Sequence, residues 1–329
     1  MSPIPLPDGL RQQLVPATGL QPQERRGRYA PSPTGTLHLG NLRTALISWL
    51  VTRLQGGEWL LRLDDLDTPR NRPGAEEGIL QDLAWLGLTW DGPVIRQSER
   101  RGLYASVLSS LRRVGALYPC RCSRRLLGDI SAPHAGSPVY PGFCRGQSPR
   151  WGVEQGRLPS WRLAVQPGLL CWTERLAACG QRDATTEVGD VVLRRADGYL
   201  AYHLATAVDE LSLGITDVVR GSDLWCSTAP QVAVMQRLGG AVPVYWHVPL
   251  WCDGQGQRLS KRQGGLGLQS LREQGMEAAA VVGLLASSLN LVPAGSRLSA
   301  NELRQHLDLT SLEGCLLALA PGASEGPKA

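Results

Sequence analysis

Residues 27–41, GRYAPSPTGTLHLGN, constrain the fold of this chain more than any other stretch. They begin as a buried strand that ends near Ala30, after which two prolines and a glycine block both a longer strand and an early helix. From Leu37 onward, apolar side chains recur every three or four residues, which is the spacing of one buried helix face. The sequence therefore predicts a strand, a rigid turn and a helix in direct succession.

The first turn of this predicted helix carries His38 and Gly40. A helix N-terminus offers unpaired N–H groups and a partial positive charge, so an imidazole and a glycine at this point form a suitable seat for a phosphate chain. A capping turn with a surface histidine is the alternative that these two residues alone leave open.

Further strands and helices alternate after this segment. Residues 58–63 predict a short apolar strand that ends in the acidic run 64–67, and helices are expected near 73–86 and 98–114. This alternation predicts an α/β fold with a doubly wound parallel sheet. Because ligands bind beyond the carboxyl ends of the strands in such sheets, the acidic run and the turn after Ala30 should face one crevice.

The second half of the chain continues the pattern after an interruption. Paired strands are expected at 190–195 and 199–205, the second of which turns helical near His203 in an alternative interpretation. The other predicted elements are a strand at 215–223, a helix at 228–238, a strand at 246–252 and helices at 271–288 and 300–307, the last two begun by capping boxes at Ser270 with Glu273 and at Ser299 with Glu302.

Composition shifts divide the chain into six expected segments. The first is rich in Pro, Gln and Arg and lacks the continuous apolar region of a signal peptide. The segments are a disordered leader (1–26), the first half of a nucleotide-binding domain (27–117), an insertion that carries a cysteine cluster (118–189), the second half of the domain (190–265), a short helical region (266–310) and a tail (311–329).

Three of the eight cysteines, Cys120, Cys122 and Cys144, are clustered. A Cys-x-Cys pair followed 22 residues later by a third cysteine suggests a structural zinc, which prefers four N, S or O donors. Chemistry alone leaves the fourth donor open, and His134 is the first candidate. Reduced cysteines without a metal are the alternative interpretation.

The overall composition constrains the function less than these motifs do. The net charge of +5 is compatible with a nucleic-acid partner but does not require one, and no apolar run reaches the length of a membrane span, so the cytoplasm is the default location. Only two of the 34 basic residues are lysines, and one of them, Lys261, lies in the run QRLSKRQGG. A chain that otherwise prefers arginine favours a compact, mobile ammonium group at this position.

The PSPTG–HLGN segment and the LSKR run resemble the two signatures of class I aminoacyl-tRNA synthetases, in their glutamyl form. With the RLDDLD strand end, the cysteine cluster and VVRGSDL in the same order, residues 27–265 resemble a glutamyl-type catalytic domain, and more narrowly the glutamyl-Q tRNA(Asp) synthetase family. Only 64 residues follow Gly265, which is short of a typical domain of roughly 100–150 residues, so an anticodon-binding domain is not expected.

The resemblance implies a Rossmann-like catalytic domain and an ATP-dependent ligase. Glutamate would react with ATP, without tRNA, to give glutamyl-adenylate and pyrophosphate, and the glutamate would then pass to the queuosine base of tRNA(Asp). Mg²⁺ and one Zn²⁺ are the implied metals. The expected partners are glutamate, ATP and queuosine-containing tRNA(Asp), with no membrane and a monomeric state.

The resemblance also assigns roles to residues. His38, Gly40, Asn41 and Lys261 would serve catalysis, and His38, Gly40, Ser260 and Lys261 would bind ATP. In the metal site, Tyr140 matches the tyrosine that this family uses as fourth ligand beside Cys120, Cys122 and Cys144. The implied glutamate pocket consists of Arg28, Tyr29, Ala30, Pro31, Ser32, Asp64, Tyr202 and Arg220, although surface salt bridges are the alternative for the two arginines.

One position departs from the pattern, because Asp64 stands where relatives commonly have glutamate. A backbone shift, a bridging water or a changed amino-acid preference would accommodate the shorter side chain. Two rival functions remain. One is a shortened glutamyl-tRNA synthetase that charges a tRNA 3′ end, and the other is an inactive RNA-binding or zinc-scaffold relative.

Overall fold

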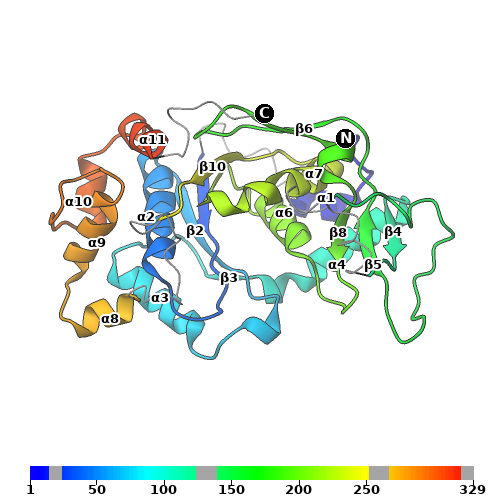
Figure 1. The fold of residues 1–329 in the computed structure, drawn as a ribbon, viewed down its shortest axis with the longest axis horizontal. Helices are drawn as coiled ribbons and strands as arrows, with labels where there is room; N and C mark the ends of the chain where they lie inside the picture. Colours follow the sequence, from blue (N-terminus) through cyan, green and yellow to red (C-terminus); the bar gives the residue numbers. More distant parts are fainter. Residues whose placement is uncertain (15–23, 124–138, 252–266, 320–329) are drawn as a thin grey trace.

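A five-stranded parallel sheet lies at the centre of the computed structural model, which describes residues 1–14, 24–123, 139–251 and 267–319 (Figure 1). The sheet has the order β10-β9-β1-β2-β3. Its strands are β1 (Arg26–Tyr29), β2 (Glu58–Leu63), β3 (Ile95–Arg96), β9 (Asp217–Gly221) and β10 (Val244–Val248). All neighbouring strands run parallel, so the α/β prediction is confirmed.

Both faces of the sheet are covered, because residues along each strand alternate between two apolar cores. Val218 and Tyr245 belong to one core, and the next residues, Val219 and Trp246, belong to the other. The first core contains α4 (Arg101–Arg113), α6 (Tyr202–Ser212) and α7 (Thr228–Leu238), whereas the second contains α2 (Leu39–Leu54) and α3 (Ala75–Trp85). Short 3-10 turns lie at Thr68–Arg70, Gln97–Arg100 and Ser222–Ser227.

Helix α2 lies very close to β1. A Cβ atom at Gly27 would stand 1.9 Å from Thr52 Oγ1, so only glycine allows this approach. The close packing fixes the N-terminus of α2 beyond the carboxyl end of β1, as the strand, turn and helix pattern predicts.

The insertion forms its own small sheets (Figure 1, right). Strands β4 (Leu117–Cys120), β5 (Ser160–Leu163) and β8 (Val191–Arg194) form an antiparallel sheet, and β6 (Leu169–Trp172) pairs with β7 (Gly180–Asp183) in a hairpin. A π-helical turn at Ala184–Val188 leads into β8. The insertion sheet thus extends beyond the expected boundary at residue 189.

The predicted strand at 199–205 is wrong. Leu200 makes only an isolated bridge with Arg194, and α6 begins at Tyr202. The reason is packing, since Leu204, Ala207 and Leu211 give this segment a buried face with helical spacing.

The prediction of a disordered leader is also wrong for residues 1–14. Helix α1 (Asp8–Leu14) buries Leu10 and Leu14 in the core shared with α4 and α6. The backbone N–H of Ile4 donates to the Arg237 carbonyl at 2.9 Å. The four-residue spacing of Leu10 and Leu14 is typical of a buried helix face, but the prolines nearby favour an irregular segment.

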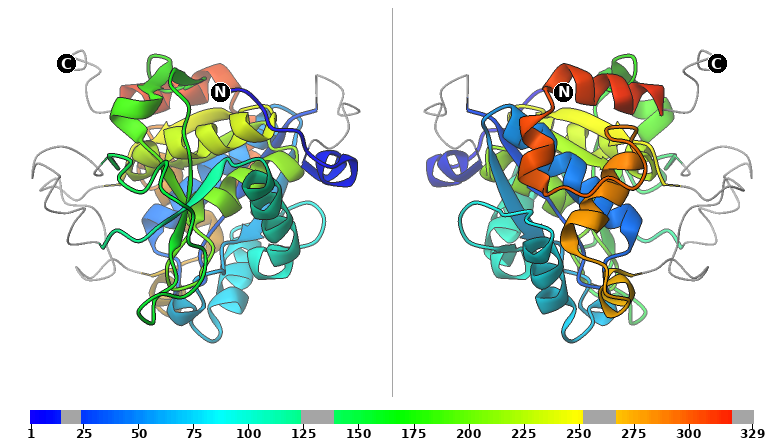
Figure 2. Two further views of the ribbon diagram at one scale, coloured as in Figure 1. Left: turned by 90° about the vertical axis from the view of Figure 1, so that its right-hand side faces the viewer. Right: turned by 90° about the vertical axis from the view of Figure 1, so that its left-hand side faces the viewer.

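Helices from the C-terminal part of the described chain pack against α2 and α3 (Figure 1 and Figure 2). They are α8 (Leu268–Glu273), α9 (Ala278–Ser287), α10 (Ala300–Gln305) and α11 (Leu309–Ala318). Helix α8 lies beside α3, and the other three lie against α2. The capping box at Ser299 and Glu302 is confirmed. The single helix expected at 271–288 is wrong, because Gly275 adopts φ +78° between α8 and α9, and Ser270 lies inside α8 rather than at its cap.

The tail expected at 311–329 is wrong for its described part, because α11 buries Leu312 and Leu316 against α2 and its neighbours. Among the described residues, no helix is both long enough and apolar enough to cross a membrane.

Candidate active site

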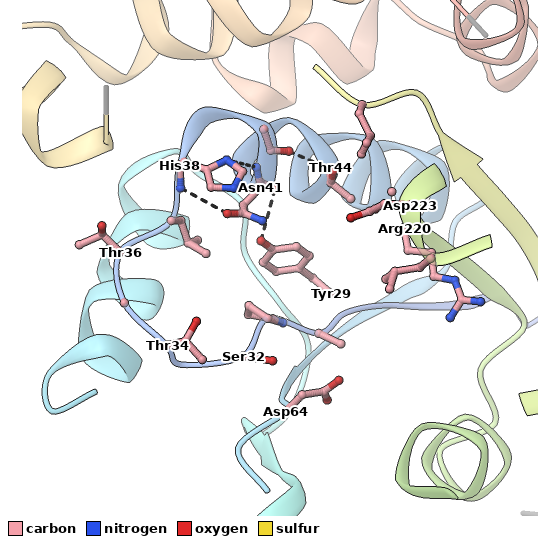
Figure 3. A pocket seen from close by; sticks show the side chains of 18 of the residues that line it. Tyr29, Ser32, Thr34, Thr36, His38, Asn41, Thr44, Asp64, Arg220 and Asp223 are labelled. Carbon is pink, nitrogen blue, oxygen red and sulfur yellow. Dashed lines mark hydrogen bonds between the residues drawn. The ribbon is translucent and has the colours of Figure 1, made fainter. Parts of the chain in front are cut away.

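A pocket of about 810 Å³ opens at the carboxyl ends of β1, β2, β9 and β10. Figure 3 shows His38 and Asn41 on one side of it and Arg220 on the other. The pocket brings together all the described residues that the sequence predicted for glutamate and nucleotide: Arg28, Tyr29, Ala30, Pro31, Ser32, His38, Gly40, Asn41, Asp64, Tyr202 and Arg220. Their segments lie far apart in the chain, so the sheet topology assembles the site.

His38 caps α2 through a reciprocal pair of hydrogen bonds. The Asn41 N–H donates to His38 Nδ1 at 3.3 Å, and the His38 N–H donates to Asn41 Oδ1 at 3.4 Å. Because Nδ1 accepts, a neutral imidazole carries its proton on Nε2. A Cβ atom at Gly40 would lie 3.1 Å from His38 Cε1, so glycine gives the ring room at the helix start.

Tyr29 forms a rigid wall between the strand end and this helix start. Its hydroxyl donates to the Asn41 carbonyl at 3.3 Å, and its ring stacks on Trp59 with centroids 6.2 Å apart. Burial, with a contribution from the charge of Asp82, raises the pKa of Tyr29 well above its usual range. The tyrosine therefore stays neutral and acts as a hydrogen-bond donor.

Two arginines at the β1 and β2 end of the pocket share one buried carboxylate. Arg28 Nε donates to Glu210 Oε1 at 2.9 Å, and Arg62 Nη1 donates to the same oxygen at 3.3 Å. Burial opposes ionisation of Glu210, but the charges of Arg28 and Arg62 hold its pKa below the usual range. Neighbouring Asp209 lies 3.6 Å from Arg62 Nε, so α6 supplies two acidic side chains to this end.

The carboxylate of Asp64 is bound by Arg62. Arg62 Nε donates to Asp64 Oδ1 at 2.7 Å and Arg62 Nη2 donates to Oδ2 at 3.3 Å. Burial raises the pKa of Asp64, and the Arg62 charge partly offsets this. The short carboxylate thus points from the end of β2 toward the pocket in an orientation that Arg62 fixes.

Arg220, on β9, has a different environment. Its side chain donates to three neutral acceptors, at 2.8 Å to Gln231 Oε1 and Thr228 Oγ1 and at 3.1 Å to His247 Nε2. Only 4% of the residue is exposed. Within the described part of the chain no carboxylate lies at ion-pair distance from it. A buried guanidinium with neutral protein partners has the chemistry to bind an anion.

Buried polar atoms without a protein partner surround Arg220 and Glu210. They come from α6 and from the residues next to Arg220: His203 Nδ1, Thr206 Oγ1, Glu210 Oε2, Gln231 Nε2 and Tyr245 OH. Unpaired atoms in this number are unusual in a folded interior, and they indicate that this part of the protein binds a polar ligand or water.

Ser260 and Lys261, the residues of the second signature, lie outside the described residues. The residues that flank this segment adjoin the pocket. Trp251 lines the pocket, and Gly267 forms a bridge with His38.

Sequence reasoning missed several pocket residues. Thr34, Thr36 and Thr44 surround the start of α2, and Arg70, Arg72 and Asp223 lie at the rim. The three threonines lie within the predicted turn and helix. In the sequence, their closeness to His38 is the only indication that they line the pocket. Glu210 is harder to find, because 182 residues separate it from Arg28.

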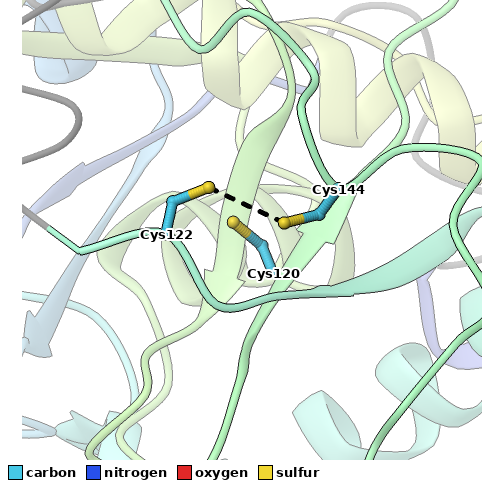
Figure 4. Close-up of side chains that lie close together, drawn as sticks. All are labelled: Cys120, Cys122 and Cys144. Carbon is cyan, nitrogen blue, oxygen red and sulfur yellow. Dashed lines mark hydrogen bonds between the residues drawn. The ribbon is translucent and has the colours of Figure 1, made fainter.

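The cysteine cluster is a second candidate site, and none of its three cysteines lines the pocket. The Sγ atoms of Cys120, Cys122 and Cys144 lie within 4.8 Å of one another (Figure 4), so the predicted cluster assembles and could hold a metal ion. The Tyr140 hydroxyl lies 3.4 Å from Cys120 Sγ and 3.5 Å from Cys122 Sγ. His134 lies outside the described residues.

The environment favours the thiolate at Cys120, whereas burial, with a contribution from the charge of Cys120, raises the pKa of the Cys122 thiol to about 11. Burial opposes ionisation of Cys120, but hydrogen bonds from the Tyr140 hydroxyl, the Cys122 backbone and the Arg162 side chain lower its pKa to about 7. A thiolate is the form that binds a metal. Three sulfurs and one phenolic oxygen match the tetrahedral donor number of a structural zinc site.

Comparisons with known proteins agree with this geometry. Residues 24–289 match the family described as tRNA synthetases class I (E and Q), catalytic domain. The glutamyl-Q tRNA(Asp) synthetase of Prochlorococcus marinus (strain MIT 9303) is 55% identical over 302 residues, which cover 92% of this chain and 94% of that protein. The protein of the same name from Parasynechococcus marenigrum (strain WH8102) is 58% identical over 282 residues, with coverage of 86% and 89%.

A solved structure is also similar. The glutamate tRNA ligase from Elizabethkingia meningosepticum, in complex with its amino acid, superposes with a TM-score of 0.72 at 27% sequence identity. The match covers 88% of this chain but only 65% of that chain, so the similarity spans less than two thirds of the ligase.

Proposed function

Since this chain belongs to the class I tRNA synthetases for glutamate and glutamine, and within them to the glutamyl-Q tRNA(Asp) synthetases, we propose that it activates glutamate with ATP and passes the glutamate to the queuosine base of tRNA(Asp). The observation that carries this proposal is one pocket with the buried guanidinium of Arg220 on one side and the capped N-terminus of α2 on the other. Such a pocket would bring a carboxylic acid next to a phosphate chain.

The glutamate side is built from β1, β2, α6 and β9. Arg220 would bind the side-chain carboxylate, because its three protein partners are neutral and leave its charge available. Asp64 would hold the ammonium group, and Tyr202 lines the same pocket. Arg28, Ser32 and the backbone at Tyr29, Ala30 and Pro31 would complete the amino-acid site.

The shorter Asp64 does not by itself change the substrate in this proposal. Arg62 fixes the Asp64 carboxylate through both oxygens, so the backbone does not have to move. A bridging water can span the missing methylene at little cost. Glutamate therefore remains the proposed substrate.

The nucleotide side is the start of α2. His38 Nε2–H would donate to a phosphate oxygen, since Nδ1 is already used as an acceptor. Gly40 and Asn41 would bring the ATP close to the free N–H groups of the first turn. Ser260 and Lys261 would approach from the segment whose flanking residues, Trp251 and Gly267, adjoin the pocket.

The chemistry follows from positioning and charge neutralisation. A glutamate carboxylate oxygen attacks the α-phosphorus in line with the departing pyrophosphate, and the acceptor on the queuosine base then displaces AMP from the carbonyl carbon. His38 and Lys261 would stabilise the charge that develops on the phosphates. Mg²⁺, when bound, would neutralise the same phosphates from the solvent side.

The proposal also includes the identity of the metal, the oligomeric state and the location in the cell. Zn²⁺ is the metal proposed for Cys120, Cys122, Tyr140 and Cys144, and its role is structural because the donor set leaves no open position. The protein would work as a monomer in the cytoplasm, where ATP and tRNA are available.

A transfer assay tests the proposed function. Purified protein is given ATP, labelled glutamate and tRNA(Asp) that either carries or lacks queuosine. The expected result is label on the queuosine-containing form alone. Label on both forms, or on tRNA(Glu), would instead favour a shortened glutamyl-tRNA synthetase, and no adenylate at all would favour an inactive RNA-binding relative.

A further inference from the structure

Three buried side chains, those of Arg220, His247 and Glu174, are hydrogen-bonded in a row that begins at the pocket with Arg220. Arg220 Nε donates to His247 Nε2 at 3.1 Å, and His247 Nδ1 lies 2.6 Å from Glu174 Oε2. The residues are 4%, 6% and 6% exposed, respectively. Arg220 is on β9 and His247 on β10, whereas Glu174 belongs to the inserted part of the chain next to β6.

The proton positions in this row are determined by the donors. An arginine Nε always carries a proton, so the His247 Nε2 atom that faces it must be the unprotonated acceptor. The Thr228 hydroxyl also lies 3.1 Å from Nε2 and itself accepts from Arg220 Nη2. His247 is therefore neutral, with its proton on Nδ1, and it donates this proton to Glu174.

Glu174 uses its two oxygens for two different donors. Oε2 accepts from His247 Nδ1, and Oε1 accepts from the His247 backbone N–H at 3.0 Å. The Leu176 N–H approaches Oε1 as well, at 3.5 Å. An ionised carboxylate satisfies all these donors, whereas a neutral amide offers only one oxygen.

Backbone pairing fixes the position of Glu174 in the sheet. The Tyr245 N–H donates to the Thr173 carbonyl, and the Arg175 N–H donates to the Tyr245 carbonyl, both at 2.9 Å. Residues 173–175 thus extend the parallel sheet beyond β10. The insertion therefore supplies an extra segment at the edge of the sheet whose strand ends form the pocket.

Aromatic rings restrict the imidazole further. Tyr245 stacks on His247 with ring planes 5° apart and centroids 5.7 Å apart, and Trp225 meets it at 4.9 Å in an edge arrangement. The guanidinium of Arg220 lies 4.9 Å from the Tyr245 ring centroid. These contacts leave His247 little freedom to rotate.

We propose that Glu174 and His247 are positioning residues that hold Arg220 ready for the side-chain carboxylate of glutamate. The imidazole acts as a neutral spacer. Glu174 supplies a counter-charge through it, without forming the direct ion pair that would occupy Arg220 and compete with the substrate. This inference rests on the proposed function, because it assigns the row of residues to glutamate binding.

The row makes a specific prediction for Glu174→Gln. Backbone N–H groups of His247 and Leu176 will keep the single amide oxygen, so the amide NH₂ will face His247 Nδ1. The imidazole proton must then move to Nε2, where it opposes the Arg220 Nε–H. We expect the KM for glutamate to rise about tenfold, the usual effect of one lost hydrogen bond to a charged group, with the KM for ATP within about twofold.

Asp217→Asn is the matched control. Asp217 is also buried in the sheet, at the opposite end of β9, where it accepts from Trp246 Nε1 at 3.1 Å. This variant should leave both KM values within about twofold of wild type, because it does not touch Arg220. A rise in the KM for glutamate that is equal in the two variants would overturn the positioning role.

Nitrogen NMR of histidine-labelled wild-type protein provides a test that needs no variant. In the wild type, His247 should carry its proton on Nδ1. In Glu174→Gln, as an additional check, the proton should be on Nε2. A wild-type His247 protonated on Nε2 would overturn the proposal even if Glu174→Gln failed to fold. An activation reaction that does not depend on glutamate at all would instead refute the proposed function, and the NMR result would still stand by itself.

Discussion

The two arginines of the pocket, Arg28 and Arg220, are equally buried but are held in opposite ways. Arg28 forms a direct ion pair with Glu210 at 2.9 Å, and 3% of it is exposed. Arg220 donates to three neutral acceptors, and 4% of it is exposed. A direct carboxylate partner cancels the charge of the first arginine, whereas the charge of the second remains available.

The difference indicates a division of labour. Arg28, Arg62, Asp209 and Glu210 form a network whose charges satisfy one another, so they fix the ends of β1 and β2. Arg220 is the position where an incoming carboxylate gains most. Arg220 should therefore contribute most to binding of the glutamate side-chain carboxylate, and the buried network of Arg28, Arg62, Asp209 and Glu210 should contribute most to stability.

Replacement of the available charge should have the largest effect. Arg220→Gln keeps a planar, polar side chain but removes the charge, so glutamate activation should fall by roughly a hundredfold to a thousandfold in kcat/KM. The fold should persist, because the neighbouring acceptors are neutral. ATP–pyrophosphate exchange at varied glutamate measures the loss, and a decrease below tenfold would show that another residue binds the carboxylate.

Loss of the paired carboxylate should mainly affect stability. Glu210→Gln leaves Arg28 buried without its counter-ion and removes one of the carboxylate partners of Arg62, so it should lower the free energy of unfolding by about 3 kcal/mol. Glu58→Gln is the control, because Glu58 forms an exposed ion pair with Arg26, and it should cost less than about 1 kcal/mol. Urea unfolding compares the two variants, and equal losses would contradict the division of labour.

The two sides should also lose stability in different pH windows. Burial, with a contribution from Arg220, lowers the pKa of His203 to about 4. The unfolded chain then binds the additional proton, so stability falls as the pH decreases from about 6.5 to 4, by up to about 3 kcal/mol. Glu210 has a lowered pKa, so its contribution is present above the unfolded pKa of about 4.3 and is lost as the pH falls through its folded pKa.

Variants separate these windows. The difference in unfolding free energy between wild type and His203→Gln should change between about pH 6.5 and 4. The difference between wild type and Glu210→Gln should change only at the lower pH values where Glu210 is protonated. Unfolding free energies at successive pH values provide both differences. A single shared window would mean that the two sides titrate as one network.

The smallest effect is expected from the cysteine cluster. Chelation of the metal proposed for it should lower the melting temperature of the insertion, but it should leave the rate of glutamate activation within about twofold, because the cluster touches neither arginine. Zinc content and exchange activity are measured on the same sample. A large loss of activation would show that the insertion transmits its state to the pocket, and residues 173–175 would be the first path to examine.

The sequence predicted the parts of this site that lie in one continuous segment. Residues 27–41 indicated both the local fold and the position of His38, because prolines, a glycine and a helical repeat act over short distances. The spacing of Cys120, Cys122 and Cys144 likewise indicated a cluster. Local chemistry was sufficient in both cases.

Contacts between distant segments were not predictable in the same way. Asp209 and Glu210 resemble the solvent face of an amphipathic helix in sequence, yet both are buried because α6 packs against the ends of β1 and β2. Glu174 gave no signal at all, since its partner His247 lies 73 residues away. Burial of a charged residue depends on tertiary contacts, which a single sequence does not display.

Glutamate-dependent ATP–pyrophosphate exchange, measured without tRNA and repeated with glutamine, tests the central claim most directly. Glutamine has the same shape as glutamate but lacks the charge that Arg220 would bind. The account predicts exchange with glutamate and at least about a hundredfold lower kcat/KM with glutamine. Equal exchange with both, or better exchange with another amino acid, would contradict it.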